Sequence, residues 1–390
     1  MTTNQRLALT NGRIILPDRI VDGQALLIEA GRVVDRVEPD ALGAEVETFD
    51  VGGQYIAPGL IDIHIHGAMG HIFNESTAEA FTAITQEVAR HGITSLLATT
   101  MTAPIDNLVE CLAFSREWLA QPRGGAQVLG VHVEGPYFSL AQSGAQDPAN
   151  IRNPDDGTVE ALLAYHDVIK IFTYAPELPG ALDLTRRLKT LGILAAAGHS
   201  SAQDSDVRAA MDAGLSHIIH IWSAQSSTIK EGPWRKPGLL EATLTFDGLT
   251  VEMITDNKHL PPTLMKLAYK CLGPDRLCAI SDATSGAGLP EGSRFRMGEM
   301  EYDVHDGVGM MLDRSSFAGS TTLLSRMVPI LIDVVGIPVV EAIRMVSLTP
   351  ARIIDVADRK GSLEPGRDAD LVLFDAHFTP QTTMIGGEWV

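Results

Sequence analysis

The chain has 390 residues, of which 45% are hydrophobic and 20% charged, and this balance excludes a disordered protein. Thirty Lys and Arg against 49 Asp and Glu leave a formal net charge of −19, which argues against a general binder of nucleic acid or of anionic membranes. The three cysteines lack metal-type spacing, and the chain shows neither an N-terminal apolar segment nor an apolar run long enough to span a bilayer. We therefore expect a cytoplasmic protein without disulfides.

The two ends of the chain both predict short β-strands. The runs LALTNGRIILP, ALLIEAGRVVDRV and TFDVGGQYIAP near the N-terminus are broken by Asn-Gly, Ala-Gly and Gly-Gly turns. The C-terminal runs DADLVLFD and TTMIGGEWV have the same character. Because chain termini often lie close together, we predict that residues 1–57 and 355–390 form one small β domain.

Between these ends, short apolar runs rich in β-branched residues alternate with helical patterns that close on glycine. Continuous apolar strands are typical of a parallel sheet covered by helices. Eight such runs predict a (β/α)8 TIM-type barrel over residues 58–354, with a doubly wound open sheet as the alternative. The runs are residues 60–66, 94–101, 127–135, 168–176, 193–200, 217–222, 250–256 and 277–284.

Histidines and a glutamate stand at the ends of the predicted strands, where active sites of such barrels are built. His64 and His66 lie two residues apart on the first strand, so both rings point to one face, into the barrel mouth. Glu134, His199 and His217 lie on or just after three further strands. Two imidazoles and one carboxylate bind a divalent transition metal and leave a position for water, so these three residues are the predicted ligands.

Asp282 ends the last predicted strand, which is otherwise apolar. A buried carboxylate without a partner is costly, so its presence there needs a reason. We predict that Asp282 is the general base that accepts a proton from water at the metal. The alternative is a structural role, in which Asp282 caps the loop that follows the strand.

With these residues in place, the chain resembles the N-acetylglucosamine-6-phosphate deacetylase family of the amidohydrolase superfamily. The resemblance implies a (β/α)8 barrel with a small β-sandwich formed by both termini, and a homodimer. It also implies one or two divalent metal ions per subunit, with zinc as first choice and iron, cobalt or manganese as alternatives. The motifs that carry it run in the family's order: APGLIDIHIHG, HVEGPYFS, GAQDP, APE, AAGHSSA, HIIHIWSA, RKPGLLEA, ITDNKHLPP, ISDATSGAGLPEG, FAGSTTLL and LTPARIIDVADRKGSLEPGRDADLVLFD.

The resemblance also implies roles for individual residues. Asp282 matches the catalytic aspartate, and Arg235 matches an arginine that binds the sugar phosphate with involvement of the neighbouring subunit. The residues that match metal ligands are Glu134, His199 and His217, joined by His64 and His66 in members with two metals. The implied substrate contacts are Gln146, His220, Ile221, Arg235 and His259.

Three departures from the family pattern fall near the substrate. One is the unusual loop between His220 and Arg235, which is followed by Lys236 in place of the more common glutamate, and the other two are single residues. Gln146 stands where the family usually has a histidine, and glutamine can donate a hydrogen bond but cannot carry positive charge. His220 stands where we place the family's usual asparagine. None of the three touches the predicted ligands or Asp282, so we expect hydrolysis to be retained and leave the identity of the sugar open.

The expected reaction is hydrolysis of the N-acetyl amide of N-acetylglucosamine 6-phosphate to glucosamine 6-phosphate and acetate. Deacetylation of N-acetylgalactosamine 6-phosphate or of an unphosphorylated amino sugar is one alternative. Hydrolysis of N-acyl amino acids or cyclic ureides on the same metal site is another. A barrel that has lost its chemistry and only binds a partner is the third, and the full set of ligand residues argues against it.

Overall fold

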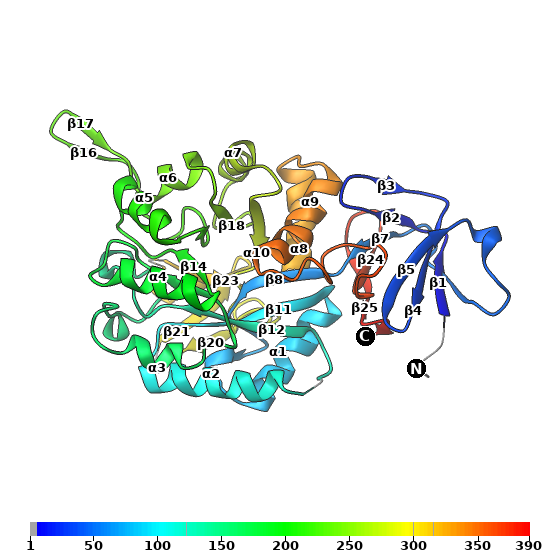
Figure 1. Cartoon of the computed structure of the whole chain (residues 1–390), viewed down its shortest axis with the longest axis horizontal. Helices are drawn as coiled ribbons and strands as arrows, with labels where there is room; N and C mark the ends of the chain where they lie inside the picture. Colours follow the sequence, from blue (N-terminus) through cyan, green and yellow to red (C-terminus); the bar gives the residue numbers. More distant parts are fainter. Residues whose placement is uncertain (1–5, 122, 299, 315) are drawn as a thin grey trace.

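The computed structural model describes residues 6–121, 123–298, 300–314 and 316–390, so the first five residues of the predicted small domain lie outside the described part. Eight parallel strands form one sheet in chain order, and Ile65 pairs with Ala283 where the last strand returns to the first (Figure 1). The predicted barrel is therefore confirmed and the open sheet is excluded. The strands are β8 (Leu60–Ile65), β11 (Ile93–Thr100), β12 (Gln127–Glu134), β13 (Ile169–Tyr174), β14 (Leu194–Ala197), β15 (His217–Ile218), β18 (Thr250–Ile254) and β19 (Leu277–Ile280).

The barrel strands are buried on both faces, as their continuous apolar sequences predict. Every residue of β8 and of β11 is buried, because helices cover the outside while side chains fill the inside. α1 begins where the Thr77 hydroxyl accepts a hydrogen bond from the Ala80 amide, and α4 ends at Gly192 with φ of 72°. The helices are α1 (Ala78–Arg90), α2 (Ile105–Leu119), α3 (Val159–Leu163), α4 (Ala181–Leu191), α5 (Asp204–Ala213), α6 (Leu239–Thr245), α7 (Pro262–Leu272), α8 (Leu324–Pro329), α9 (Val339–Met345) and α10 (Leu348–Ile353), with short helical turns at Pro39–Ala41, Phe73–Glu75, Leu140–Gln142, Pro148–Asn150 and Ile330–Val334.

Both ends of the chain meet in a separate body of two sheets, beside the barrel in Figure 1. In the larger sheet β24 (Leu371–Phe374) pairs antiparallel with β7 (Tyr55–Pro58), so the C-terminal segment joins the N-terminal one. Apolar side chains from the N-terminal and C-terminal segments form the core of this body. The larger sheet also contains β2 (Arg13–Ile15), β3 (Ile20–Val21), β25 (Pro380–Ile385) and β26 (Glu388–Trp389), and the smaller one contains β1 (Arg6–Thr10), β4 (Ala25–Glu29), β5 (Arg32–Val37) and β6 (Glu47–Asp50). The boundaries at 57/58 and 354/355 stay a prediction.

A four-stranded antiparallel sheet follows the last barrel strand, and the sequence analysis did not anticipate it. Its strands are β20 (Arg294–Met297), β21 (Met300–His305), β22 (Val308–Met311) and β23 (Phe317–Ser320). Phe295, Tyr302 and Met101 belong to its own small apolar core, so the sheet packs onto the segment that follows β11. Ser320 returns to the barrel by pairing with Ala283.

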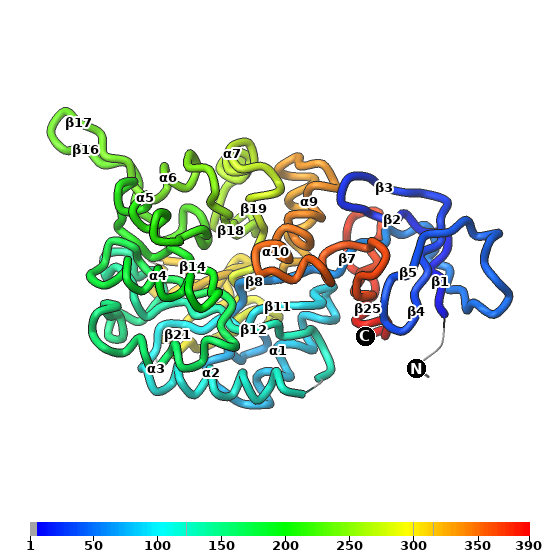
Figure 2. The backbone as a smooth tube through the Cα atoms, in the orientation of Figure 1, coloured from blue at the N-terminus to red at the C-terminus, as the bar shows by residue number. Residues whose placement is uncertain are grey.

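Two shorter ribbons complete the fold. β9 (Gly67–Ala68) pairs with β10 (His71–Ile72) directly after the first barrel strand. β16 (Ile229–Glu231) and β17 (Trp234–Lys236) form a hairpin that projects from the barrel, as the backbone trace in Figure 2 shows. Among the described residues, none of the helices has the length and apolar character needed to cross a membrane.

Candidate metal centre and active site

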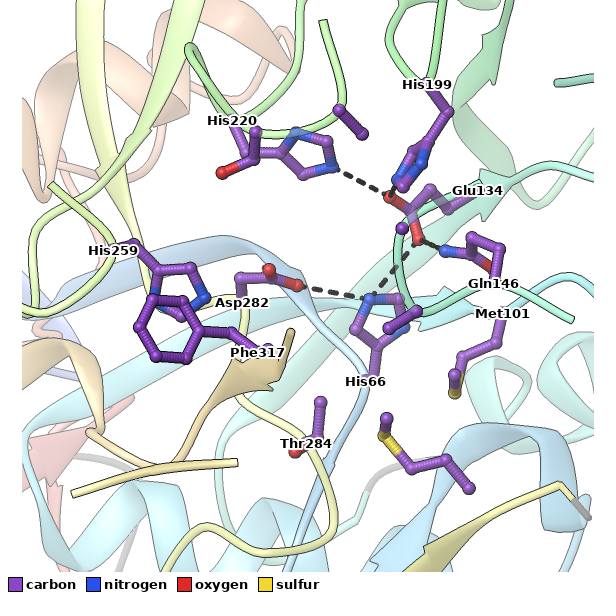
Figure 3. Close-up of a pocket in the computed structure, with 16 residues that line it drawn as sticks. His66, Met101, Glu134, Gln146, His199, His220, His259, Asp282, Thr284 and Phe317 are labelled. Carbon is purple, nitrogen blue, oxygen red and sulfur yellow. Dashed lines mark hydrogen bonds and ion pairs between the residues drawn. The ribbon is translucent and has the colours of Figure 1, made fainter. Parts of the chain in front are cut away.

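A cluster of buried imidazoles and carboxylates lies at the C-terminal rim of the barrel. His64 is on β8 and His66 directly follows it, while Glu134 is the last residue of β12. His199, His220 and Asp282 follow β14, β15 and β19, each two residues beyond the strand end. Figure 3 shows His66, Glu134, His199, His220 and Asp282 around one cavity of about 190 Å³, which His64 does not line.

Glu134 is the centre of the cluster. Its Oε1 lies 3.2 Å from His199 Nε2, 3.1 Å from His220 Nε2 and 3.6 Å from His64 Nε2. Its Oε2 lies 3.4 Å from His66 Nε2. Two sets of three possible metal-ligand atoms therefore share this one carboxylate, His64–His66–Glu134 and Glu134–His199–His220.

Asp282 lies beside the first of these sets. Its Oδ1 is 3.3 Å from His66 Nε2 and 3.6 Å from His64 Nε2. Burial alone would raise the pKa of Asp282, but the hydrogen bond from His66 and the charges of His64 and His66 lower it. The carboxylate is therefore ionised at neutral pH and available to accept a proton.

The placement of His217 corrects the predicted ligand set. Its ring lies deeper in the barrel, where Nε2 is 3.1 Å from Glu252 Oε1 and Nδ1 is 2.7 Å from Thr250 Oγ1. His220 takes the position on Glu134 that the sequence analysis gave to His217. The physical reason is that β15 ends at Ile218, so His217 points into the barrel while His220 lies in the loop at the rim.

The remaining predicted substrate contacts are placed unevenly around the cavity. His259 lines it, whereas Ile221 is packed in the barrel core and is not among its lining residues. Arg235 is exposed on β17 of the projecting hairpin and is not among the residues that line the cavity. Gln146 lines the cavity, but its amide donates to Glu134 Oε2 while its oxygen accepts from the Thr102 amide. Because Thr102 N–H can only donate, this orientation of the Gln146 side chain is determined.

Two residues that sequence reasoning missed support the cluster from below. Glu252 on β18 accepts a hydrogen bond from His64 Nδ1 at 2.8 Å in addition to the one from His217. His132 on β12 donates from Nδ1 to the Ile63 carbonyl at 3.0 Å, and burial together with the His64 charge lowers its pKa to about 3. A glutamate inside the apolar run TVEMITD was the signal for Glu252, by the same argument that singled out Asp282.

The hydrogen bonds show that the cluster fits a metal ion. The Gln142 carbonyl can only accept, so His199 donates to it from Nδ1, and Nε2 faces Glu134. In the same way His64 donates from Nδ1 to Glu252, and its Nε2 is buried without a hydrogen-bond partner, facing Glu134 and Asp282. A ring nitrogen directed at a carboxylate oxygen requires a proton or a cation between the two atoms. Imidazole and carboxylate donors suit Zn and related divalent metals.

The electrostatics of His64 and Glu134 agree with this fit. Burial lowers the pKa of His64, but the charges of Glu252 and Glu134 outweigh it and raise the pKa to about 10. Burial raises the pKa of Glu134, while the His64 charge and contacts from His199 and His220 hold it well below the usual carboxyl range. The site therefore favours positive charge beside Glu134.

A parallel barrel that gathers imidazoles and carboxylates at the C-terminal rim of its strands defines a hydrolase of the metal-binding type. The model of the amidohydrolase family matches residues 55–390, and the chain belongs to this family. The relatives that it matches are named deacetylases, which are hydrolases of amide bonds.

Comparisons with individual proteins agree with this family assignment. The chain is 32% identical to N-acetylgalactosamine-6-phosphate deacetylase of Escherichia coli O157:H7, over 96% of this chain and 97% of the relative. It is 33% identical to N-acetylglucosamine-6-phosphate deacetylase of Vibrio furnissii, over 88% of this chain and 85% of the relative. The crystal structure of N-acetylglucosamine-6-phosphate deacetylase from Pasteurella multocida superimposes with a TM-score of 0.92 at 29% identity, covering 99% of each chain.

Proposed function

We propose that this chain removes the acetyl group from an N-acetylhexosamine 6-phosphate, with N-acetylglucosamine 6-phosphate as the first-choice substrate. The observation that carries the proposal is Glu134, shared by two groups of imidazoles and facing Asp282 across one cavity. The relatives support the substrate class, and one of them acts on the galactosamine epimer.

The proposed metal site holds one or two divalent ions per subunit, with zinc as first choice over iron, cobalt and manganese. Glu134, His199 and His220 hold one ion, and His64, His66 and Glu134 offer a second position. When bound, the metal lowers the pKa of a water molecule and polarises the substrate carbonyl.

The chain's own side chains perform the proton transfers. Asp282 accepts the proton of the attacking water as the C–O bond forms, and then returns it to the amine nitrogen as the C–N bond breaks. Gln146 holds Glu134 in place through its hydrogen bond and supplies a second N–H toward the cavity. His259 lies on the opposite side from Gln146 in Figure 3, where it can contact the sugar.

A homodimer is part of the proposal. Arg235 and the exposed Trp234 stand on the projecting hairpin and do not line the cavity of their own subunit, which supports a contact with the cavity of a partner. The guanidinium of Arg235 would then bind the substrate phosphate. A cytoplasmic location is also proposed, and the three unpaired cysteines Cys111, Cys271 and Cys278 support it.

Acetate release from four substrates tests the function directly. The assay compares N-acetylglucosamine and N-acetylgalactosamine, each with and without the 6-phosphate, with metal supplied. We expect the phosphorylated glucosamine substrate to be fastest. A preference for the galactosamine epimer would move the proposal to that substrate, and no release from any of the four would overturn it.

Asp282→Asn tests the assigned chemistry. The variant should fold and retain metal but lose kcat by a factor on the order of 10² to 10⁴, the range for loss of a general acid–base group. Asp247→Asn, an exposed carboxylate far from the cavity, is the control and should be unchanged. Near wild-type turnover in Asp282→Asn would contradict the mechanism.

A further inference from the structure

A second cavity of about 530 Å³ adjoins the catalytic one and is larger than it. Three residues line both cavities: Met101, Ala145 and Met297. Met297 comes from β20 of the antiparallel sheet, and Met101 follows the barrel strand β11. The wall between the cavities therefore consists of two flexible thioether side chains and one methyl group, which can move apart for an apolar chain.

The lining of the second cavity is partly apolar, and it also includes Arg296 and Thr102, whose buried hydroxyl has no hydrogen-bond partner. Beyond the shared wall the cavity is lined by Ile72, Ala103, Pro104 and Met300 among the described residues. Most of the polar side chains along it are already engaged within the protein. Asn74 and Asn107 bond to each other and to backbone carbonyls, Asp147 accepts from the Ala149 amide and the Asn150 side chain, and Glu75 accepts from the Ile72 amide.

The direction of the substrate follows from the two sides of the catalytic cavity. Figure 3 shows His259 and Asp282 on one side of His66, and Gln146 with Met101 on the other. A sugar carries hydroxyl groups and finds polar partners on the side of His259. The substituent on the scissile carbonyl is apolar. The side of Met101 and Met297 is the apolar side that leads to the second cavity, whereas Phe317 on the other side packs against His259.

We propose that the second cavity is an acyl-chain subsite, so that the enzyme hydrolyses amino-sugar amides whose acyl group is longer than acetyl, such as N-butanoyl and N-hexanoyl. This inference rests on the proposed function, because it concerns the same amide at the same site. The reaction stays balanced: water adds its oxygen to the carbonyl carbon, the C–N bond breaks, and the products are a fatty carboxylate and the protonated amino sugar.

The test is a chain-length series on the metal-loaded enzyme. N-acetyl, N-propanoyl, N-butanoyl and N-hexanoyl glucosamine 6-phosphate are compared by release of the amino sugar. In the wild type, kcat/KM for the butanoyl and hexanoyl substrates should stay within about tenfold of the acetyl value, whereas a closed pocket loses about 10- to 200-fold for each added methylene.

Ala103→Phe fills the second cavity without touching the catalytic one, because Ala103 lines only the former. The variant should lose the hexanoyl activity by about tenfold or more while the acetyl activity stays unchanged. Ala103→Ser keeps the volume and is the matched control. Should Ala103→Phe fail to fold, the chain-length series on the wild type still tests whether the enzyme accepts longer acyl chains.

The outcomes separate this inference from the proposed function. Fast hydrolysis of the acetyl substrate with a steep fall for every longer chain would overturn the acyl-chain subsite and leave the proposed function intact. Equal losses for acetyl and hexanoyl substrates in Ala103→Phe would also overturn it. Inactivity toward the whole series would overturn the proposed function itself.

Discussion

Three of the side chains that build the site sit on strained backbone. His199, His220 and Asp282 have φ of 46°, 23° and 48°, in a region that residues with a Cβ rarely adopt. Each such residue costs about 1–3 kcal/mol and persists only where surrounding contacts hold it. All three follow a barrel strand by two residues, so the turn away from the strand directs each side chain into the cavity. The strain lies where function requires a particular side-chain direction.

Glu252 determines how His64 is presented to the cavity. Its carboxylate is fully buried and accepts hydrogen bonds from His64 and His217. Glu252→Gln keeps the shape but removes the charge, so the ring of His64 loses its fixed tautomer. Metal affinity should fall by about 10- to 100-fold, as for other supports of metal-bound histidine. Metal content at buffered free zinc measures this directly.

The control for this change is Glu117→Gln, an exposed carboxylate on α2. It should bind metal as the wild type does. If Glu252→Gln keeps wild-type metal content at every buffered concentration, the supporting role of Glu252 is wrong.

The pKa of His259 depends on Asp256. Burial lowers this pKa, but the hydrogen bond and the charge of Asp256, whose Oδ2 lies 2.7 Å from His259 Nδ1, outweigh burial and raise it. Asp256→Asn removes the charge and leaves the burial, so the pKa should fall below the ordinary value of about 6.5. NMR titration of the His259 ring, identified through His259→Gln, measures the change.

Ser320→Ala provides the comparison, because it removes a hydrogen bond of 3.0 Å to the same oxygen without changing charge. Its effect on His259 should be smaller. A pKa that does not move in Asp256→Asn would show that the charge of Asp256 does not control His259.

At the scale of the elements, two insertions decide what surrounds the chemistry. The sheet β20–β23 brings Met297 and Phe317 to the cavity, and Phe317 packs against His259 with ring centroids 4.9 Å apart. The hairpin β16–β17 instead carries Arg235 away from it. The barrel therefore supplies the clustered imidazoles and carboxylates, while the sheet β20–β23 supplies part of the cavity wall.

Arg235→Ala tests the hairpin's proposed contact with phosphate. The loss of one charge-assisted hydrogen bond should raise KM for the phosphorylated substrate by about tenfold or more, with little change in kcat. The unphosphorylated sugar should be unaffected. The control is Lys230→Ala, because Lys230 is the cross-strand neighbour of Arg235 in the same hairpin.

Mixing subunits separates a contact within one chain from a contact between chains. Dimers of Arg235→Ala with Asp282→Asn should regain part of the activity, because one of the two composite sites then has both residues. If mixing restores no activity under conditions where subunits exchange, the two subunits do not share a site.

At the scale of the whole molecule, a buried ion pair spans the C-terminal segment that leads from α10 to β24. Lys360 lies in the segment after α10, and its Nζ donates to Asp370 and lies 3.3 Å from Asp368. Asp370 precedes β24 and accepts from the Gly386 amide at 2.8 Å. Lys360 and Asp370 are only 3% and 5% exposed, so solvent cannot replace a missing partner.

Lys360→Met leaves Asp370 buried without its cation, and the free energy of unfolding should fall by about 3–5 kcal/mol. Chemical denaturation followed by circular dichroism measures the change. Arg19→Met breaks an exposed pair with Asp18 and should show no measurable effect. A stability equal to wild type in Lys360→Met would mean that the pair does not stabilise the fold.

The sequence by itself determined the barrel and most of its rim. A strand buried on both faces requires a continuous apolar run, and this local signal identified all eight strands. Because parallel strands end at one rim, the polar residues after them could be grouped before any contact was known. His64, His66, Glu134, His199 and Asp282 were brought together on that ground alone.

Only the tertiary structure decided the rest. His217 and His220 are three residues apart, and which ring meets Glu134 depends on where a two-residue strand ends, which no local pattern shows. Three further features depend on contacts between segments that are distant in the chain. They are the support of His64 by Glu252, the hydrogen bond from Gln146 to Glu134, and the wall that contains Met101 and Met297. Such contacts exist only once the strands have closed into a barrel, because side chains from opposite strands meet only there.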